Sequence, residues 1–257
     1  MLSEHERGVR QMSLTASAYD SSWPGKEPVA SRAHTAGVLA VIFGAGFYSL
    51  WVWLHAGPDA IAGASERHAI LSYYLPGIIY EWLLLFYVWR GARRRLPRLR
   101  DWVGGRWENG TQILKDILIA ILFWVVWYAV LKFVQFVLGP SHSTLVQPMF
   151  PQGPVEAITW ILLSISSGFC EELVFRRYLM RQFAAWTGSF ASGVLIQGAV
   201  FGLAHPSLGI KQMIVISISG VMMGCLALLR RSLRPGIVMH AWADIFGGLI
   251  VKGLPYK

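Results

Sequence analysis

Long apolar runs constrain the fold of this chain more than any other feature. A helix that spans a membrane needs about 20 largely apolar residues, and charged residues make up only 14% of this chain, compared with about 25% in soluble domains. The mean hydropathy is +0.47. Seven segments are long or nearly long enough to span: residues 35–54, 69–89, 113–138, 155–180, 188–205, 210–229 and 235–251. We therefore predict an all-α polytopic membrane protein, a bundle of about seven transmembrane helices.

Basic residues are distributed unevenly between these segments. If the spans alternate in direction, seventeen Lys and Arg residues fall on one side of the membrane and four on the other. Loops rich in Lys and Arg stay on the cytoplasmic side. We therefore predict a multi-pass protein of a bacterial inner (plasma) membrane with its N-terminus in the cytoplasm.

The densest basic run lies in residues 90–106, between the second and third spans. The net charge of +9 does not predict nucleic-acid binding, because the basic residues lie between apolar runs and not on one continuous face. We predict instead that this loop contacts anionic lipid headgroups. The other interpretation is that it only sets the orientation of the chain. Its seven arginines are Arg90, Arg93, Arg94, Arg95, Arg98, Arg100 and Arg106.

Ionisable side chains occur within the apolar runs. The second run carries Pro76 and Glu81. A charged side chain at the middle of a bilayer costs about 2.5–3.5 kcal/mol, so such residues usually face the bundle interior and serve a function. Three groups of them stand on three of the last four runs, and their members are Glu171, Glu172, Arg176, His205, His240 and Asp244.

The first group is a pair of adjacent glutamates. Glu172 and Arg176 are four residues apart with the carboxylate first, which is the favourable order for an ion pair on a helix. Glu171 lies about 100° around the helix from Glu172, so it points elsewhere. An unpaired carboxylate in an apolar site suits a general base. The alternative is that the whole group lies solvated at the cytoplasmic interface with Arg177 and Arg181.

The second and third groups each contain a histidine. Phe201 precedes His205 by four residues, so its ring can pack on the imidazole, and Pro206 predicts that the helix ends or kinks there. His240 and Asp244 are also four apart and can converge on one point. An interfacial histidine and a buried hydrogen-bonded pair are the structural alternatives. The three groups reach one depth most easily if the fourth helix continues past Arg181 through "RQFAAW".

The three groups together resemble the CPBP family of intramembrane proteases, the CAAX-protease and bacteriocin-processing family, also called Abi. Its pattern is EExxxR, then FxxxH, then HxxxN or a variant. The corresponding stretches here are "EELVFR" at 171–176, "FGLAH" at 201–205 and "HAWAD" at 240–244. The resemblance covers roughly residues 155–250.

The resemblance implies hydrolysis of a peptide bond within the membrane. It implies that Glu171 and His205 activate water and that His240 and Asp244 stabilise the oxyanion, with Glu172, Arg176 and Phe201 as supporting residues. The predicted substrate is a membrane-embedded or amphipathic peptide or protein.

Asp244 departs from the asparagine that is common in this family. An amide can donate a hydrogen bond to an oxyanion, but an ionised carboxylate cannot. Asp244 either stays protonated, or orients His240 as the sole donor, or joins Glu171, His205 and His240 as a ligand of a divalent metal such as zinc. The family has been described both as metalloproteases and as metal-independent glutamate proteases, and the sequence leaves this choice open.

Other functions also fit parts of the pattern. Intramembrane Glu, His and Asp residues build ion or proton relays in transporters, and a non-enzymatic scaffold or immunity protein can retain a polar core. Cys170 adjoins Glu171 as a potential nucleophile, although buried thiols are usually inert. The nearly complete set of three motifs favours the protease.

The chain divides into three predicted regions. Residues 1–34 form a cytoplasmic N-terminal tail, without the apolar core of a signal peptide. Residues 35–150 hold the leading transmembrane helices with the Arg-rich loop 90–106, and residues 151–257 hold the CPBP-like catalytic helices. The pairs Gly198 with Gly202 and Gly220 with Gly224 predict close packing of the fifth and sixth spans.

Overall fold

The computed structural model describes residues 27–56, 70–139 and 150–250, and it is 85% helical with no strand in this part of the chain. The predicted all-α fold is confirmed. Two elements, η1 and η3, are π-helical and η4 is a 3₁₀ turn. The elements are α2 (Arg32–Ala56), η1 (Ile70–Tyr74), α5 (Leu75–Ala92), α6 (Leu99–Val103), α7 (Gly110–Leu138), α8 (Pro154–Glu171), η3 (Glu172–Leu179), α9 (Met180–Thr187), α10 (Phe190–Leu203), η4 (Pro206–Leu208), α11 (Gly209–Arg230) and α12 (Arg234–Leu249).

Five helical segments in the described part are long and apolar enough to cross a membrane. The longest runs without a break from α8 through η3 to α9, 34 residues from Pro154 to Thr187. The fourth span therefore continues past residue 180, through the "RQFAAW" stretch. The two other predicted spans are shorter helices, α10 with 14 residues and α12 with 16. Most of the predicted tail, residues 1–26, lies outside the described residues.

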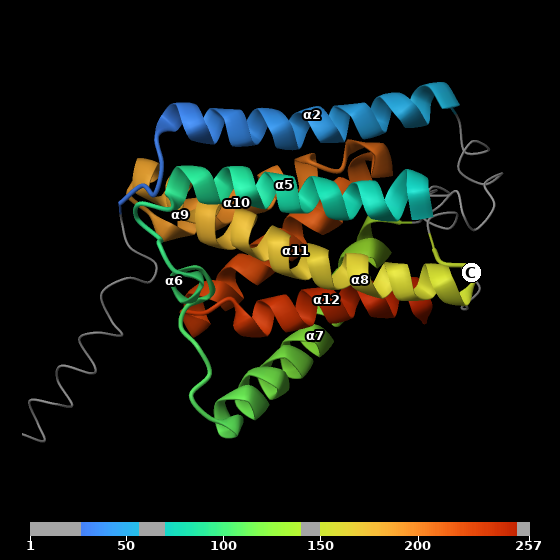
Figure 1. Cartoon of the computed structure of the whole chain (residues 1–257). Coiled ribbons are helices and arrows are strands. Elements are labelled where there is room, and N and C mark those ends of the chain that lie inside the picture. Colours follow the sequence, from blue (N-terminus) through green and yellow to red (C-terminus); the bar gives the residue numbers. More distant parts are fainter. Residues whose placement is uncertain (1–26, 57–69, 140–149, 251–257) are drawn as a thin grey trace, which may run out of the picture.

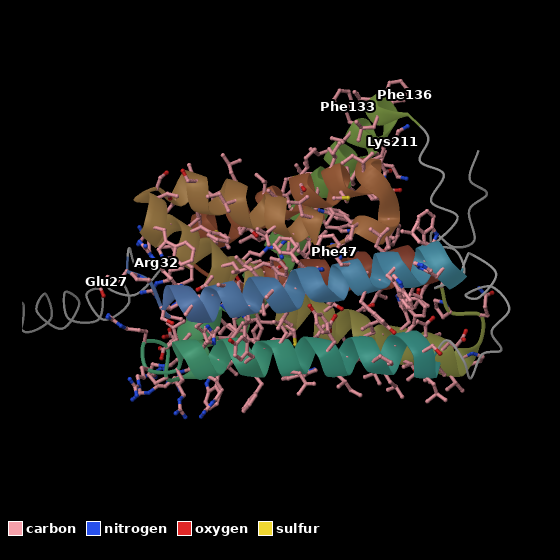
Figure 2. All side chains as sticks on the ribbon, turned by 90° about the horizontal axis from the view of Figure 1, so that it is seen from above. Glu27, Arg32, Phe47, Phe133, Phe136 and Lys211 are labelled. Atoms are coloured by element: carbon pink, nitrogen blue, oxygen red, sulfur yellow. The ribbon has the colours of Figure 1, made fainter. Side chains whose placement is uncertain are left out.

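The helices form a layered bundle (Figure 1). α2 packs on α5, α5 on α8 and α8 on α12, while α7 crosses this stack obliquely. The outer surface carries large apolar side chains: Phe136 and Leu229 are 83% and 82% exposed. Side chains project outward all around the bundle in Figure 2. An apolar exterior on long apolar helices identifies an integral membrane protein.

Charged side chains concentrate at one end of the bundle. Glu27 and Arg32 lie there, and Lys211 lies at the opposite end (Figure 2). The seven arginines of residues 90–106 are all exposed. Buried Asp116 pairs with Arg230 at 3.4 Å and with Arg234 at 3.2 Å, which ties the start of α7 to the end of α11 and the start of α12.

Glycines allow the helices around the core to approach closely. A Cβ atom on Gly202 would clash with the carbonyl oxygen of Met213, so the predicted close packing of α10 on α11 is present. A Cβ atom on Gly168 would lie 2.7 Å from the backbone nitrogen of Ala241. Because Gly168 lies three residues before Glu171 and Ala241 follows His240, this contact brings the two motifs together.

Candidate active site

The first motif lies where the long helix changes from α-helical to π-helical geometry. Glu171 ends α8 and Glu172 begins η3, whose eight residues are all buried. π-Helical turns occur frequently at functional sites. The alternative of a solvated charge cluster is wrong for this segment, because Glu172, Arg176 and Arg177 are at most 1% exposed.

Glu172 and Arg176 form the predicted ion pair. The Arg176 Nη1 atom lies 3.1 Å from Glu172 Oε1, and both side chains are buried. The guanidinium also lies over the ring of Phe201, with Cζ 4.3 Å from the ring centroid. A buried charge requires such partners, because transfer of an unpaired ion out of water is strongly unfavourable.

His240 connects this ion pair to the cavity. Its Nδ1 atom lies 2.9 Å from Glu172 Oε1, and it donates its hydrogen to that carboxylate. Its Nε2 atom lies 3.6 Å from Glu171 Oε2 and 3.7 Å from Asp244 Oδ2. The contact with Glu172 was not predicted from the sequence. It fixes the orientation of the ring, in the manner of the carboxylates that orient metal-bound or catalytic histidines.

His205 lies just after α10, which ends at Leu203 before Pro206 as predicted. Its Nδ1 atom lies 2.8 Å from the carbonyl oxygen of Phe201. A carbonyl only accepts, so Nδ1 carries the hydrogen and Nε2 is left with a lone pair. The two rings pack edge to face, with centroids 5.4 Å apart, so the predicted contact between Phe201 and His205 is present.

The predicted catalytic residues line one cavity of about 500 Å³. Glu171, His205, His240 and Asp244 reach it from α8, from the turn after α10 and from α12, and Trp127 of α7 closes part of its wall. Residues that are up to 73 positions apart in the sequence are thereby brought to one polar site within the bundle.

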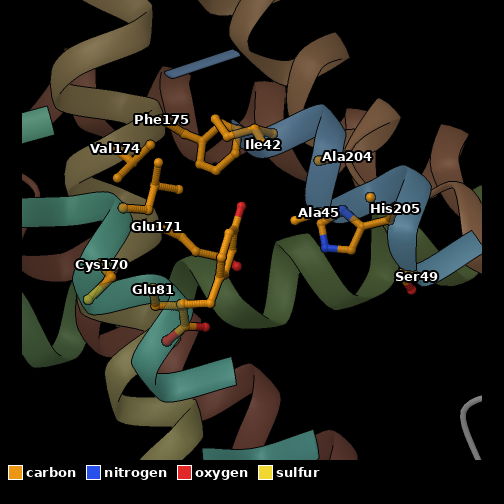
Figure 3. Close-up of a pocket in the computed structure, with 13 residues that line it drawn as sticks. Ile42, Ala45, Ser49, Glu81, Cys170, Glu171, Val174, Phe175, Ala204 and His205 are labelled. Carbon is orange, nitrogen blue, oxygen red and sulfur yellow. The ribbon is translucent and has the colours of Figure 1, made fainter. Parts of the chain in front are cut away.

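A second cavity, of about 160 Å³, is shown in Figure 3 and shares part of its lining with the first. Glu171 and His205 line both cavities, so these two side chains stand between them. The second cavity also contains Glu81 of α5, a residue to which the sequence assigned no role. Its only signal in the sequence was a lone carboxylate within the apolar run 69–89.

Within the described ranges, no group of three or more His, Cys, Asp or Glu side chains is arranged to hold a metal ion. The metal-ligand set of Glu171, His205, His240 and Asp244 thus stays a prediction. Cys170 is buried and lines the smaller cavity, whereas Cys225 is exposed.

Fold and site together define a helical membrane protein whose core holds carboxylates and imidazoles around a cavity. Residues 153–246 match a family model described as Type II CAAX prenyl endopeptidase Rce1-like, which confirms the resemblance to the CPBP family. This match supports the CAAX-type intramembrane protease family for residues 153–246. Searches of curated proteins and of solved structures gave no match.

Proposed function

We propose that this protein is an intramembrane endopeptidase that hydrolyses a peptide bond of a membrane-embedded or amphipathic peptide or protein. The observation that carries the proposal is the convergence of Glu171, His205, His240 and Asp244 on one cavity of about 500 Å³. A carboxylate and an imidazole with a free lone pair are the groups that general-base activation of water requires.

In the proposed reaction, Glu171 and His205 bind one water molecule between them. Glu171 takes a proton from this water while the water oxygen attacks the carbonyl carbon of the substrate. The tetrahedral intermediate then collapses, the carbon–nitrogen bond breaks, and Glu171 returns the proton to the leaving amine. His205 accepts a hydrogen bond from the water through Nε2, because its Nδ1 hydrogen is held by Phe201.

His240 is the proposed donor to the oxyanion. Glu171, Glu172 and Asp244 all lie within 3.7 Å of its ring nitrogens, and the proposed donor is the doubly protonated imidazolium, whose positive charge these carboxylates balance. Nε2–H then faces the cavity as a charged donor, which stabilises the developing negative charge. Asp244 acts in this proposal through His240 and does not itself donate to the oxyanion.

Of the two types of mechanism, we propose the metal-independent one, in which Glu171 and His205 activate the water. We further propose that the N-terminus lies in the cytoplasm of a bacterial cell and that the exposed arginines of residues 90–106 contact anionic lipid headgroups.

Mass spectrometry of exposed peptide termini tests the function. Membranes that contain the wild-type protein are compared with membranes that contain Glu171→Ala, His205→Ala or His240→Ala at equal levels. We expect a set of termini that only the wild type generates. Glu156→Gln is the matched control, since Glu156 is a buried carboxylate on α8 that lines neither cavity. Identical termini in all membranes would instead support a scaffold or a transporter.

A further inference from the structure

The smaller cavity has the size and position of a pocket for one substrate side chain. Its volume of about 160 Å³ is close to that of an engineered cavity of about 150 Å³ that binds benzene. Glu171 and His205 form part of its wall, so a side chain that occupies it belongs to a residue next to the scissile bond. Most of its remaining wall is apolar, and includes Ile42, Leu84 and Val174.

Glu81 gives this apolar pocket an acidic group. The side chain is only 8% exposed, and its Oε1 atom accepts a hydrogen bond from Ser167. Its Oε2 atom is buried and accepts no hydrogen bond of good geometry from a described residue, although Ser166 also interacts with this carboxyl group. A buried carboxylate oxygen without a well-placed donor is unfavourable, so this atom is a ready acceptor for a group that enters the pocket.

The charge of the pocket points to a cation. Glu81 and Glu171 both line it, and no Lys or Arg does so among the residues that the structure describes. An acidic side chain would be repelled here, and a purely apolar one would leave Glu81 unpaired. Lys and Arg combine an alkyl stem that packs on apolar walls with a charged head that binds a carboxylate.

We propose that the smaller cavity binds the side chain of a Lys or Arg residue adjacent to the scissile bond, and that Glu81 selects this residue. The inference rests on the proposed function of the site. It defines the substrate as a peptide that carries a basic residue at the cleaved bond, within or beside an apolar stretch. Membrane proteins carry such residues mainly at the cytoplasmic ends of their spans.

Synthetic peptides built on a cleavage site found by the comparison of termini provide the test. Each residue that flanks the scissile bond is replaced in turn by Lys, Arg, Gln, Glu or norleucine, which has an unbranched apolar chain without the charge. At one of these positions we expect kcat/KM for Lys or Arg to exceed that for norleucine by about 10- to 150-fold, the range for a hydrogen bond to a charged group.

Two variants assign this preference to Glu81. In Glu81→Gln, the ratio of kcat/KM for the lysine peptide to that for the norleucine peptide should fall to within about threefold of one. The loss should appear mainly in KM, because the contact binds the ground state and the transition state alike. Glu81→Asp retracts the carboxylate and should shift the preference from Lys toward the longer Arg. Glu156→Gln should keep the wild-type ratio.

The outcomes separate the two proposals. If the wild type cleaves all peptides without preferring a basic residue at either position, the pocket assignment is wrong. It is also wrong if Glu81→Gln lowers kcat/KM equally for all peptides, since that pattern indicates a general structural or catalytic role. If the termini do not differ between the wild type and Glu171→Ala, the protease function itself fails, and the pocket assignment fails with it.

Discussion

Replacement of Arg176 by Met tests the physical reasoning behind the active site most directly. The guanidinium lies 3.1 Å from Glu172 Oε1 and 4.3 Å above the centroid of Phe201, and both charged side chains are buried. Methionine retains much of the volume of the side chain but removes the charge. Among the described residues, His240 then remains the one hydrogen-bond donor to Glu172, in a buried region where water does not compensate the carboxylate.

The expected destabilisation is large. Removal of one partner of a buried ion pair costs about 3–5 kcal/mol, because the other charge is left unpaired. For a chain of this size, 1 kcal/mol corresponds to about 2–4 °C in Tm. Arg176→Met should therefore lower the Tm of the detergent-solubilised protein by about 6–20 °C, as measured by differential scanning fluorimetry on intact chains.

A double-mutant cycle gives this prediction its sharpest form. Glu172→Gln removes the carboxylate charge but keeps an oxygen that accepts from His240 Nδ1. The double variant with Arg176→Met should therefore be more stable than Arg176→Met alone, because no buried charge remains unpaired. A single Arg176→Met variant with the Tm of the wild type would refute the reasoning. The reasoning would also be refuted if the double variant lost more stability than the two single variants lose together.

Three further predictions concern other parts of the molecule. Gly168→Val should lower kcat/KM for peptide cleavage by the purified protein by about 100-fold, because a Cβ at Gly168 meets the backbone of Ala241 beside the catalytic His240. Gly44→Val is the control and should not lower it, because a Cβ at Gly44 meets nothing within 4 Å. Cleavage should persist after dialysis against EDTA or 1,10-phenanthroline, since the proposed mechanism uses no metal ion, and a loss that added zinc restores would overturn that mechanism. Gln in place of both Arg93 and Arg94 should reduce the amount of anionic lipid that co-purifies, and high salt should reduce it further; lipid mass spectrometry measures both.

The sequence predicted most of the fold because the signals involved are local. The length of an apolar run reports a helix directly, so each predicted span has a helix at its position. The ion pair of Glu172 with Arg176 and the contact of Phe201 with His205 follow from a spacing of four residues on one helix. The end of α10 before Pro206 follows from the missing backbone donor of proline.

The interactions that the sequence did not predict join distant helices. Glu172 binds His240, which is 68 residues further along the chain, and no spacing rule connects them. Glu81 reaches the site from α5 because α5 packs on α8 and Ser167 binds its carboxylate. Periodicity shows which face of a helix is polar, but only the packing of several helices decides which polar faces meet.

The adjacency of the two glutamates explains how this site divides its work. Neighbouring residues on a helix point about 100° apart, so one carboxylate can serve the core while the next serves the cavity. Glu172 points to Arg176 and to His240 Nδ1 and thereby fixes the imidazole from one side. Glu171 faces Nε2 of the same ring at 3.6 Å and lines both cavities. A single histidine is thus held by one glutamate and stands beside the proposed base, so displacement of either carboxylate should disturb His240. For this reason the adjacency of the two glutamates matters more to the chemistry than the total charge of the motif.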